Sequence, residues 1–452
     1  MTRLALLLLA GCASMAPAYE RPASPVPANL PGGDGSAAKV PVAQFVHEAK
    51  LRQVIAQALA QSRDLRRAAL DIESARQQYR IQRAQAYPSI DAGASVVATR
   101  TITGANNATT TVTQYGAQVG LPGWEIDLFG RIKSLSDAQL QRYLSSVEAA
   151  KAARISLVGE VATAWVTLAA DQSRLAIAQD TVASSKRTVE LTDQLVGGGT
   201  SNRGDFYQAS TVFQQARADV AFLTATIAQD RNALELLAGG PVADDLLPAA
   251  LPADLDWFAD VPAGLSSAVL LARPDVLAAE HDLMAANANI GAARAQFFPS
   301  LSLTASGGLA SVGLAALFTG PAAVFTLAPS LGLPLFHGGA IRANLAFSEA
   351  QKLRFVALYE LAIQRAFREV ADALATRATI TEQLAAQLAL VETATKAFEL
   401  AQARYQAGID TFLTTLVSQR ALYQAKNSLV ATQLAALGNR VTMYRVLGGG
   451  LE

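Results

Sequence analysis

The sequence of 452 residues has a single cysteine, Cys12, and only three histidines, His47, His281 and His337. One cysteine excludes a disulfide within the chain, and such scattered residues exclude a zinc site of Cys and His ligands. His281 stands beside Asp282, but the chain has neither a Gly-x-Ser-x-Gly nucleophile elbow nor a glycine-rich phosphate loop. We therefore expect no enzyme and no metal site, with His281 an ordinary residue on a helix surface.

Net charge is also absent, because 37 Lys and Arg residues balance 37 Asp and Glu residues. A neutral chain that is 51% hydrophobic is neither a nucleic-acid binder nor disordered. Glycine and proline are nearly missing from long stretches rich in Ala and Gln, which favours very long helices over several compact domains. Beyond the N-terminus no stretch reaches the roughly 18 to 20 consecutive apolar residues of a membrane helix. We therefore expect any membrane crossing to use β-strands.

The N-terminus has the pattern of a short export signal. Arg3 precedes the apolar residues 4–10, and a proline-rich stretch follows at residues 17–41. The segment Leu9-Ala10-Gly11-Cys12 is similar to the bacterial lipobox, in which the cysteine becomes the lipid-bearing N-terminus. We expect a signal peptide at residues 1–12, lipid attachment at Cys12, and a proline-rich segment at 13–44. That covalent lipid is the only cofactor expected, and Ala13 favours sorting to the outer membrane.

The chain repeats itself over about half its length. Four pairs of segments keep their order and spacing: RAQAYPS at 83–89 with RAQFFPS at 294–300, LP at 121–122 with LP at 333–334, FG at 129–130 with FHG at 336–338, and LAGG at 237–240 with LGGG at 447–450. A unit this long is a duplicated structural half, not a solenoid repeat. We expect repeats at residues 45–240 and 264–449, joined by an irregular linker at 241–263.

Each repeat contains two strand-like segments, within about residues 89–121 and 300–333. In the second repeat Leu301 and Leu303 alternate with Ser302 and Thr304, which is the pattern of a strand with one apolar and one polar face. Segments of about ten such residues suit a membrane β-barrel with a wet lumen. Four strands cannot close a barrel, since about eight is the lower limit. Several protomers are therefore expected to share one barrel.

Heptad ladders of apolar residues predict four long helices, at about residues 131–197, 204–238, 340–407 and 411–447. A helix of roughly 65 residues spans about 100 Å, a length suited to a duct across the periplasm. The last helix carries two apolar seams on different sides, as in a wall of helices closed into a tube. An antiparallel coiled-coil bundle without a channel explains the ladders equally well, but explains neither the strands nor the export signal.

Several motifs resemble the TolC-like outer membrane efflux proteins, and among them the NodT-type efflux lipoproteins. They are WEIDLFGR at 124–131, the turn at 199–209, RPDV at 273–276, FPSLSL at 298–303, LPLF at 333–336 and the turn at 405–416. The resemblance covers about residues 45–449. It implies a homotrimer, mainly α with membrane β, that combines a shared twelve-stranded barrel, a helical tunnel and an equatorial belt holding the linker.

The same resemblance implies a passive exit duct for drugs or other small toxic molecules. It implies a lipid-anchored position in the outer membrane, a periplasmic adaptor of the membrane-fusion class and an inner-membrane RND-type pump. Two alternatives stay open, a channel for type I protein secretion and a periplasmic coiled-coil scaffold. The lipobox and WEIDLFGR favour small-molecule efflux, whereas the sequence does not identify the cargo.

The hairpin turns are the expected docking points of the adaptor. Gly199 and Gly408 each follow a long helix, and glycine can adopt the left-handed conformation that reverses the chain. Asp205 and Asp410 stand just after these glycines.

A periplasmic gate is expected at the start of the last helix, at Leu413, Thr414, Val417 and Arg420. Leu413 and Arg420 are one heptad apart and share a face. In relatives acidic residues often ring the entrance at positions that match Thr414 and Val417, and both residues are uncharged here. The expected constriction is therefore a ring of Leu413 side chains with Arg420 above it. The alternative is that Leu413 is only the first rung of a coiled-coil seam.

Overall fold

The computed structural model describes residues 14–31, 41–102, 108–199, 201–260 and 266–449. Cys12 and the expected signal peptide, residues 1–12, lie outside them. The chain forms two compact units. Unit 1 combines Leu70–Val147 and Ala278–Glu360 with the N-terminal residues up to Ala23, and unit 2 combines Ser24–Ala69, Glu148–Leu277 and Leu361–Glu452. Each unit therefore takes equivalent parts from both sequence repeats instead of coinciding with one of them.

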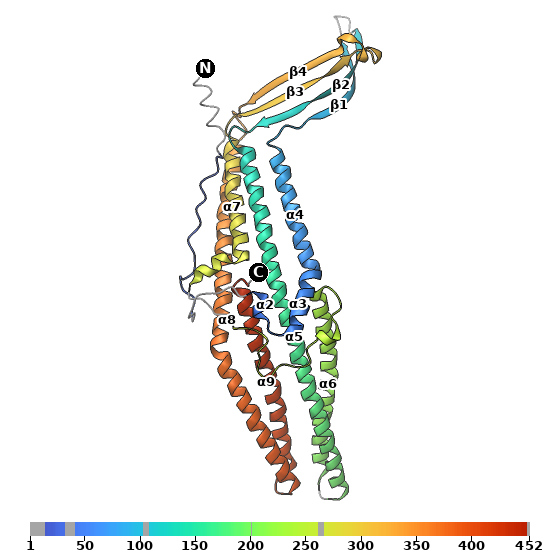
Figure 1. The fold of residues 1–452 in the computed structure, drawn as a ribbon, viewed down its shortest axis with the longest axis vertical. Coiled ribbons are helices and arrows are strands. Elements are labelled where there is room, and N and C mark those ends of the chain that lie inside the picture. Colours follow the sequence, from blue (N-terminus) through green and yellow to red (C-terminus); the bar gives the residue numbers. More distant parts are fainter. Residues whose placement is uncertain (1–13, 32–40, 103–107, 200, 261–265, 450–452) are drawn as a thin grey trace. The chain divides into compact units, whose positions relative to one another are not determined.

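Unit 1 contains one antiparallel sheet with the strand order β1-β2-β3-β4 (Figure 1). The strands are β1 (Asp91–Ile102), β2 (Thr109–Ile126), β3 (Ser300–Ser311) and β4 (Ala323–Gly332). The two repeats meet at the centre, where β2 pairs with β3. Every residue of the edge strands β1 and β4 is exposed. Within the described chain the outer edge of each of these strands has no neighbouring strand.

Strand β2 is longer than the alternating sequence pattern predicts. That pattern ends at Leu121, because Leu121-Pro122 has the composition of a strand end, whereas β2 continues to Ile126. Proline has no N–H for the ladder, and the register with β3 shifts between Leu121 and Trp124. This β-bulge accommodates Pro122, so that Trp124 still pairs with Leu303 of β3.

Each strand pair is entered and left by a helix. The helices are α4 (Arg63–Ala84) before β1, α5 (Arg131–Gly197) after β2, α7 (Pro274–Ala295) before β3 and α8 (Ala340–Gln406) after β4. In unit 1, α7 packs on α5 through small side chains, with Ala138, Ala285 and Ala288 in one buried cluster. Helix α4 buries no residue. Helices α5 and α7 thus pack on each other within the chain, whereas the side chains of α4 remain accessible to solvent.

The extended N-terminal segment, residues 14–21, is fixed along α7. The side chain of Glu280 in α7 is only 4% exposed. Its carboxylate accepts two hydrogen bonds from the Arg21 guanidinium, from Nε at 2.7 Å and from Nη2 at 2.8 Å. Tyr19 donates its hydroxyl to the same carboxylate at 3.1 Å. Burial and the Glu280 charge raise the pKa of Tyr19 above its ordinary value. Asn287 donates to the Pro17 carbonyl at 2.8 Å, and a Cβ at Gly291 would clash with the backbone of Ala16.

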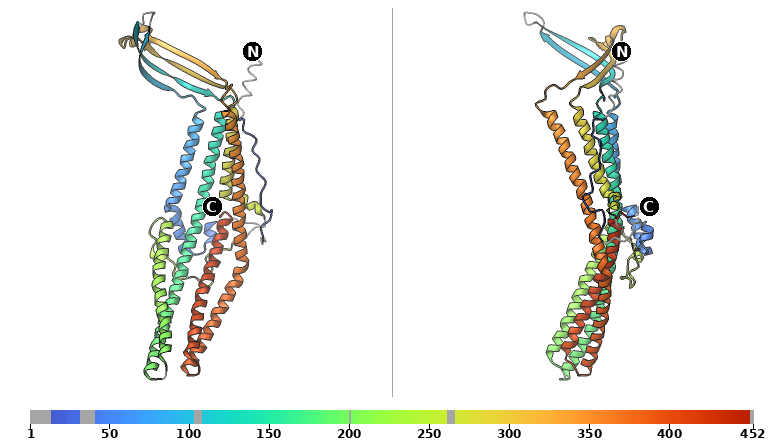
Figure 2. Two further views of the ribbon diagram at one scale, coloured as in Figure 1. Left: turned by 180° about the vertical axis from the view of Figure 1, so that it is seen from behind. Right: turned by 90° about the vertical axis from the view of Figure 1, so that its left-hand side faces the viewer.

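Unit 2 consists mainly of two helical hairpins that lie side by side (Figure 2). Helix α5 returns as α6 (Arg203–Ala238), and α8 returns as α9 (Phe412–Val446). Ala209 of α6 packs against Phe412 and Leu416 of α9, and Tyr423 of α9 donates its hydroxyl to Asp219 of α6 at 2.7 Å. Among the described helices, α5 alone has an 18-residue window of mean hydropathy 1.2, and 56% of that window is buried inside the chain.

Short elements pack around the hairpins of unit 2. They are α2 (Val42–Phe45), α3 (Ala49–Gln61), η1 (Asp244–Leu246) and η2 (Ser267–Ala272). Phe45 stacks on Tyr444 of α9 at 4.3 Å between ring centroids, and Trp257 of the linker packs edge-on against Trp165 of α5 at 4.6 Å. Aromatic rings thus attach the N-terminal helices and the linker to α5 and α9.

Arg273 of the RPDV motif joins three segments of unit 2. It is 7% exposed and forms a two-pronged ion pair with Asp275, at 3.0 and 2.7 Å. The same guanidinium donates to Glu369 of α8 at 2.9 Å and to the carbonyl of Val446, the last residue of α9, at 2.8 Å. The motif therefore fastens the C-terminal helix to the body of the unit.

Asp230 of α6 makes the stability of unit 2 dependent on pH. Burial and the neighbouring Asp171 carboxyl raise the pKa of Asp230 from 3.8 to about 6. Between about pH 4 and pH 6 the folded chain therefore holds a proton that the unfolded chain has released, so stability falls as the pH rises. We expect Asp230→Asn to raise the thermal midpoint at neutral pH and to reduce this slope, as followed by circular dichroism. A variant with the parent's slope would contradict the assignment.

Candidate functional site

The turn of the second hairpin is built around Gly408. Its φ is +70°, and the N–H groups of Gly408 and Ile409 bond to the carbonyls of Tyr405 and Arg404, both at 2.9 Å. This pattern ends a helix with a left-handed residue. The first hairpin uses Gly199 in the same way, with φ at +72°. Both glycines therefore sit at the chain reversals where the sequence places them.

The two acidic residues after these glycines bond within their own turns. Asp410 forms a two-pronged ion pair with Arg404, at 2.7 and 3.1 Å, and this hydrogen-bonded arginine lowers the pKa of the Asp410 carboxyl. Asp205 accepts from Ser201 at 3.0 Å and from Asn202 at 3.2 Å, while its own N–H donates to the Asn202 side chain. The carboxylates thus fix the shape of the turns that are expected to meet an adaptor.

The four expected gate residues lie on one face of α9. Leu413 and Val417 are 56% and 59% exposed, and Thr414 and Arg420 are also exposed. The opposite face of this first part of α9 is buried: Phe412, Thr415, Leu416 and Gln419. There the Thr415 hydroxyl donates to the Ala401 carbonyl of α8 at 3.1 Å. Helix α9 is therefore attached by one face, while the four expected gate residues are exposed on the other.

Replacing Gly408 by alanine is expected to weaken the tip of the hairpin by about 1–2 kcal/mol, because a Cβ is disfavoured at positive φ. Gly438 is the matched control, since it lies inside α9 with open space around its Cα. There alanine is expected to stabilise the chain by about 0.5–1 kcal/mol, through its higher helix propensity. Hydrogen exchange at the tip and thermal unfolding measure the two effects. Equal effects at both positions would contradict a strained turn.

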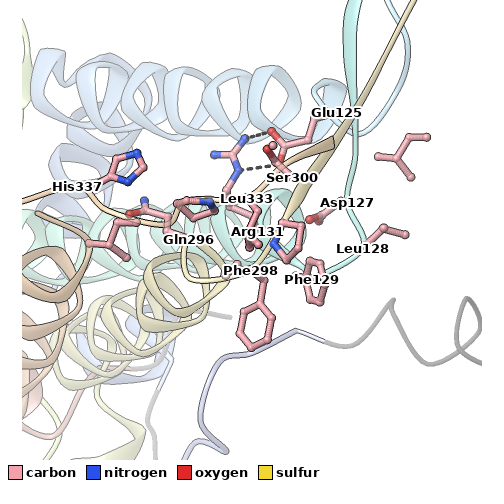
Figure 3. Close-up of a pocket in the computed structure, with 16 residues that line it drawn as sticks. Glu125, Asp127, Leu128, Phe129, Arg131, Gln296, Phe298, Ser300, Leu333 and His337 are labelled. Atoms are coloured by element: carbon pink, nitrogen blue, oxygen red, sulfur yellow. Dashed lines mark hydrogen bonds and ion pairs between the residues drawn. The ribbon is translucent and has the colours of Figure 1, made fainter. Parts of the chain in front are cut away.

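A second site lies in unit 1, where the strands meet the helices. A cavity of about 540 Å³ is lined by residues at the ends of β2 and β4 and at the starts of β3, α5 and α8 (Figure 3). Phe129 and Phe298 stack beside it, with ring centroids 4.8 Å apart. Gln296, Leu333 and His337 line it as well.

Charged residues of the WEIDLFGR motif stabilise this junction. Arg131, the first residue of α5, forms a two-pronged ion pair with Glu125 at the end of β2, at 2.8 and 2.6 Å. Asp127 accepts the backbone N–H of Lys133 at 2.7 Å and so satisfies a free donor in the first turn of α5. The motif therefore directs the chain from the strand into the helix. This cavity was not predicted from the sequence, although the segments FPS at 298–300 and LF at 128–129 contribute to its lining.

The histidine noted in the sequence has an ordinary environment. His281 Nδ1 lies 2.7 Å from the side-chain oxygen of Gln141, a hydrogen-bonding distance. Within the described residues no group of three or more His, Cys, Asp or Glu side chains could hold a metal ion.

Comparison with known sequences places both repeats in one family. The profile of the outer membrane efflux protein family matches residues 54–240 and again residues 265–449. The chain is 43% identical to the solvent efflux pump outer membrane protein SrpC of Pseudomonas putida, over 99% of this chain and 97% of that protein. It is 40% identical to the outer membrane protein OprJ of Pseudomonas aeruginosa, over 100% of this chain and 96% of OprJ.

Solved structures show the same architecture. A membrane protein from Pseudomonas aeruginosa superposes with a TM-score of 0.91 at 41% identity, covering 97% of this chain and 98% of the other. The open state of the MtrE outer membrane channel of Neisseria gonorrhoeae superposes with a TM-score of 0.86 at 36% identity, covering 97% and 99%.

Proposed function

This chain belongs to the outer membrane efflux protein family, and we propose that three copies of it form the passive exit duct of a tripartite pump. The observation that carries the proposal is the sheet of unit 1, which has an open edge on β1 and another on β4. In lipid, unpaired N–H and C=O groups are too costly to leave exposed. Pairing β1 of one copy with β4 of the next removes both edges when the ring closes.

The helices of unit 1 support the same ring. Helix α4 is the element before β1, and α8 is the element after β4. Each of the two edge strands is therefore connected to one helix. Helix α4 buries none of its residues within the chain, although Leu70 and Ile81 are 61% and 67% exposed. A neighbouring copy that covers β1 would also cover α4. A shared twelve-stranded barrel above a helical tunnel fits these surfaces.

The energy for transport comes from elsewhere. The sequence has no phosphate-binding loop, so we assign the driving force to an inner-membrane RND-type pump, joined through a periplasmic adaptor that contacts the hairpin turns at Gly199 and Gly408. Several relatives are named for the efflux of solvents, toluene or antibiotics. Small apolar toxic compounds are therefore the cargo we propose.

Anchoring and gating complete the proposal. A lipid on Cys12 would place acyl chains two residues before Ser14, whose hydroxyl lies 2.9 Å from that of Ser134 near the start of α5. We assign the gate to Leu413, Thr414, Val417 and Arg420, because these four residues are exposed on one face of α9. Three Leu413 side chains would narrow the tunnel and three Arg420 side chains would line it beyond them.

Recording in a planar bilayer tests the function. Purified native protein should be trimeric by native mass spectrometry and should give discrete conductance steps. A periplasmic coiled-coil scaffold would give none, and that result would overturn the proposal. A type I secretion channel would also conduct, so drug sensitivity of a deletion strain is needed as a second measurement. Unchanged sensitivity together with a lost secreted protein would favour the secretion channel.

A further inference from the structure

At the junction of strands and helices in unit 1, an aromatic pair joins the two repeats of a single chain. Phe129 follows the end of β2, Phe298 precedes the start of β3, and their rings stack at 4.8 Å with 24° between the planes. The pair lies where neighbouring antiparallel strands meet their helices. The stacked rings cover the ends of β2 and β3 at which these strands connect to helices.

Because the sequence is duplicated, each repeat has an aromatic residue that corresponds to one of this pair. These two further rings do not stack on each other within the described chain. Tyr87 precedes Pro88-Ser89 and β1, as Phe298 precedes Pro299-Ser300 and β3. Phe336 follows Leu335 and β4, as Phe129 follows Leu128 and β2. Tyr87 is 63% exposed and Phe336 is 88% exposed. In the described part of the chain neither ring stacks on another ring.

We propose that Phe336 of one copy packs against Tyr87 of the next copy and reproduces between chains the pair that Phe129 and Phe298 form within one. This inference rests on the proposed trimer. When β1 of one copy pairs antiparallel with β4 of another, the start of β1 lies beside the end of β4. The start of β3 lies beside the end of β2 by the same geometry.

The surroundings of both rings fit an occupied interface. Ile90, just before β1, is 76% exposed, and Leu335 and Leu333, just after β4, are 87% and 54% exposed. An apolar patch of this kind on a protein surface marks a contact site. Leu333 and His337 also line the junction cavity, so the neighbouring Tyr87 would cover that end of it.

Cysteine cross-linking tests the pairing in native membranes. Tyr87→Cys with Phe336→Cys should give covalently linked dimers and trimers with a short thiol-reactive cross-linker, whereas each single variant should give none. The matched control is Phe129→Cys with Phe298→Cys, which should react within one chain and leave it monomeric on a denaturing gel. Cys12 stays in place in all variants.

The outcomes separate the inference from the proposed function. A protein that is trimeric by native mass spectrometry, yet gives no linked chains at positions 87 and 336 while the control pair reacts, overturns the inference alone. A monomeric native protein overturns the proposed trimer and the inference together.

A second measurement uses truncation. Phe336→Ala should lower the temperature at which the detergent-solubilised trimer dissociates. Leu335→Ala, whose side chain is equally exposed in the chain, should lower it less. Equal shifts would mean that Phe336 has no particular partner and would contradict the pairing.

Discussion

Trimers carrying Leu413→Ala are expected to conduct several-fold more current than the parent and to sensitise cells to bulky antibiotics that the outer membrane normally excludes. Leu413 is 56% exposed and lies on the exposed face of α9, so its truncation leaves the buried face that joins α9 to the hairpin intact. Three leucines that narrow a pore would be replaced by three methyl groups. Single-channel recording and antibiotic susceptibility measure the effect, with trimer content as the reference.

Leu416 provides the matched control on the same helix. It is 3% exposed and packs with Phe412 and Ala209 between the two hairpins. Leu416→Ala should therefore lower the stability by about 2–5 kcal/mol through the cavity it leaves, because surrounding side chains relax only partly. Unchanged conductance in a folded Leu413→Ala trimer would place the constriction elsewhere and leave Leu413 as a rung of a coiled-coil seam.

Arg273→Ala is expected to cost about 1–3 kcal/mol of unfolding free energy, mainly because the buried carbonyl of Val446 loses its hydrogen-bond donor. The side chains of Asp275 and Glu369 are 45% and 41% exposed, so solvent screens much of the charge they would leave unpaired. The substitution removes the ion-pair partner of Asp275 and Glu369. It also removes the hydrogen-bond donor to the carbonyl of Val446 at the end of α9. The end of α9 should therefore loosen first. Thermal unfolding and hydrogen exchange of residues 440–447 measure both effects.

An exposed ion pair on the same helix as Glu369 is the control for Arg273. Arg368 Nε lies 3.7 Å from Asp372 Oδ2, and the two side chains are 80% and 73% exposed. Arg368→Ala should change the stability by at most about 1 kcal/mol, because solvent screens such a pair. A change for Arg273→Ala as small as that for Arg368→Ala would show that the contacts of Arg273 do not hold the C-terminal helix.

The long helices could be predicted from the sequence because their packing follows one rule over their whole length. Each apolar seventh residue adds to the same seam, so the signal grows with length. In the series that runs from Leu140 to Val196 in steps of seven, the single polar residue Arg154 does not break the pattern. The family and the TolC-like fold were readable from the motifs of both repeats, and the comparisons confirm them.

Other features could not be predicted because they depend on contacts that are distant in sequence. Pro122 has the local character of a strand end, and only pairing with β3 carries β2 past it. The stacking of Phe129 on Phe298 requires the two repeats to lie side by side in one sheet. The gate at Leu413 and the lipid on Cys12 stay predictions from the sequence, because a gate requires neighbouring copies and a lipid is added by other enzymes.

The binding of the N-terminal segment to α7 sets an order on biosynthesis. Arg21 and its partner Glu280 are 259 residues apart, so the segment leaves the ribosome and the export machinery long before α7 does. Until then the Arg21 guanidinium lacks the Glu280 carboxylate that it binds in the folded chain. Docking of Arg21 thus follows the export of more than half the chain and marks a late step in the folding of unit 1.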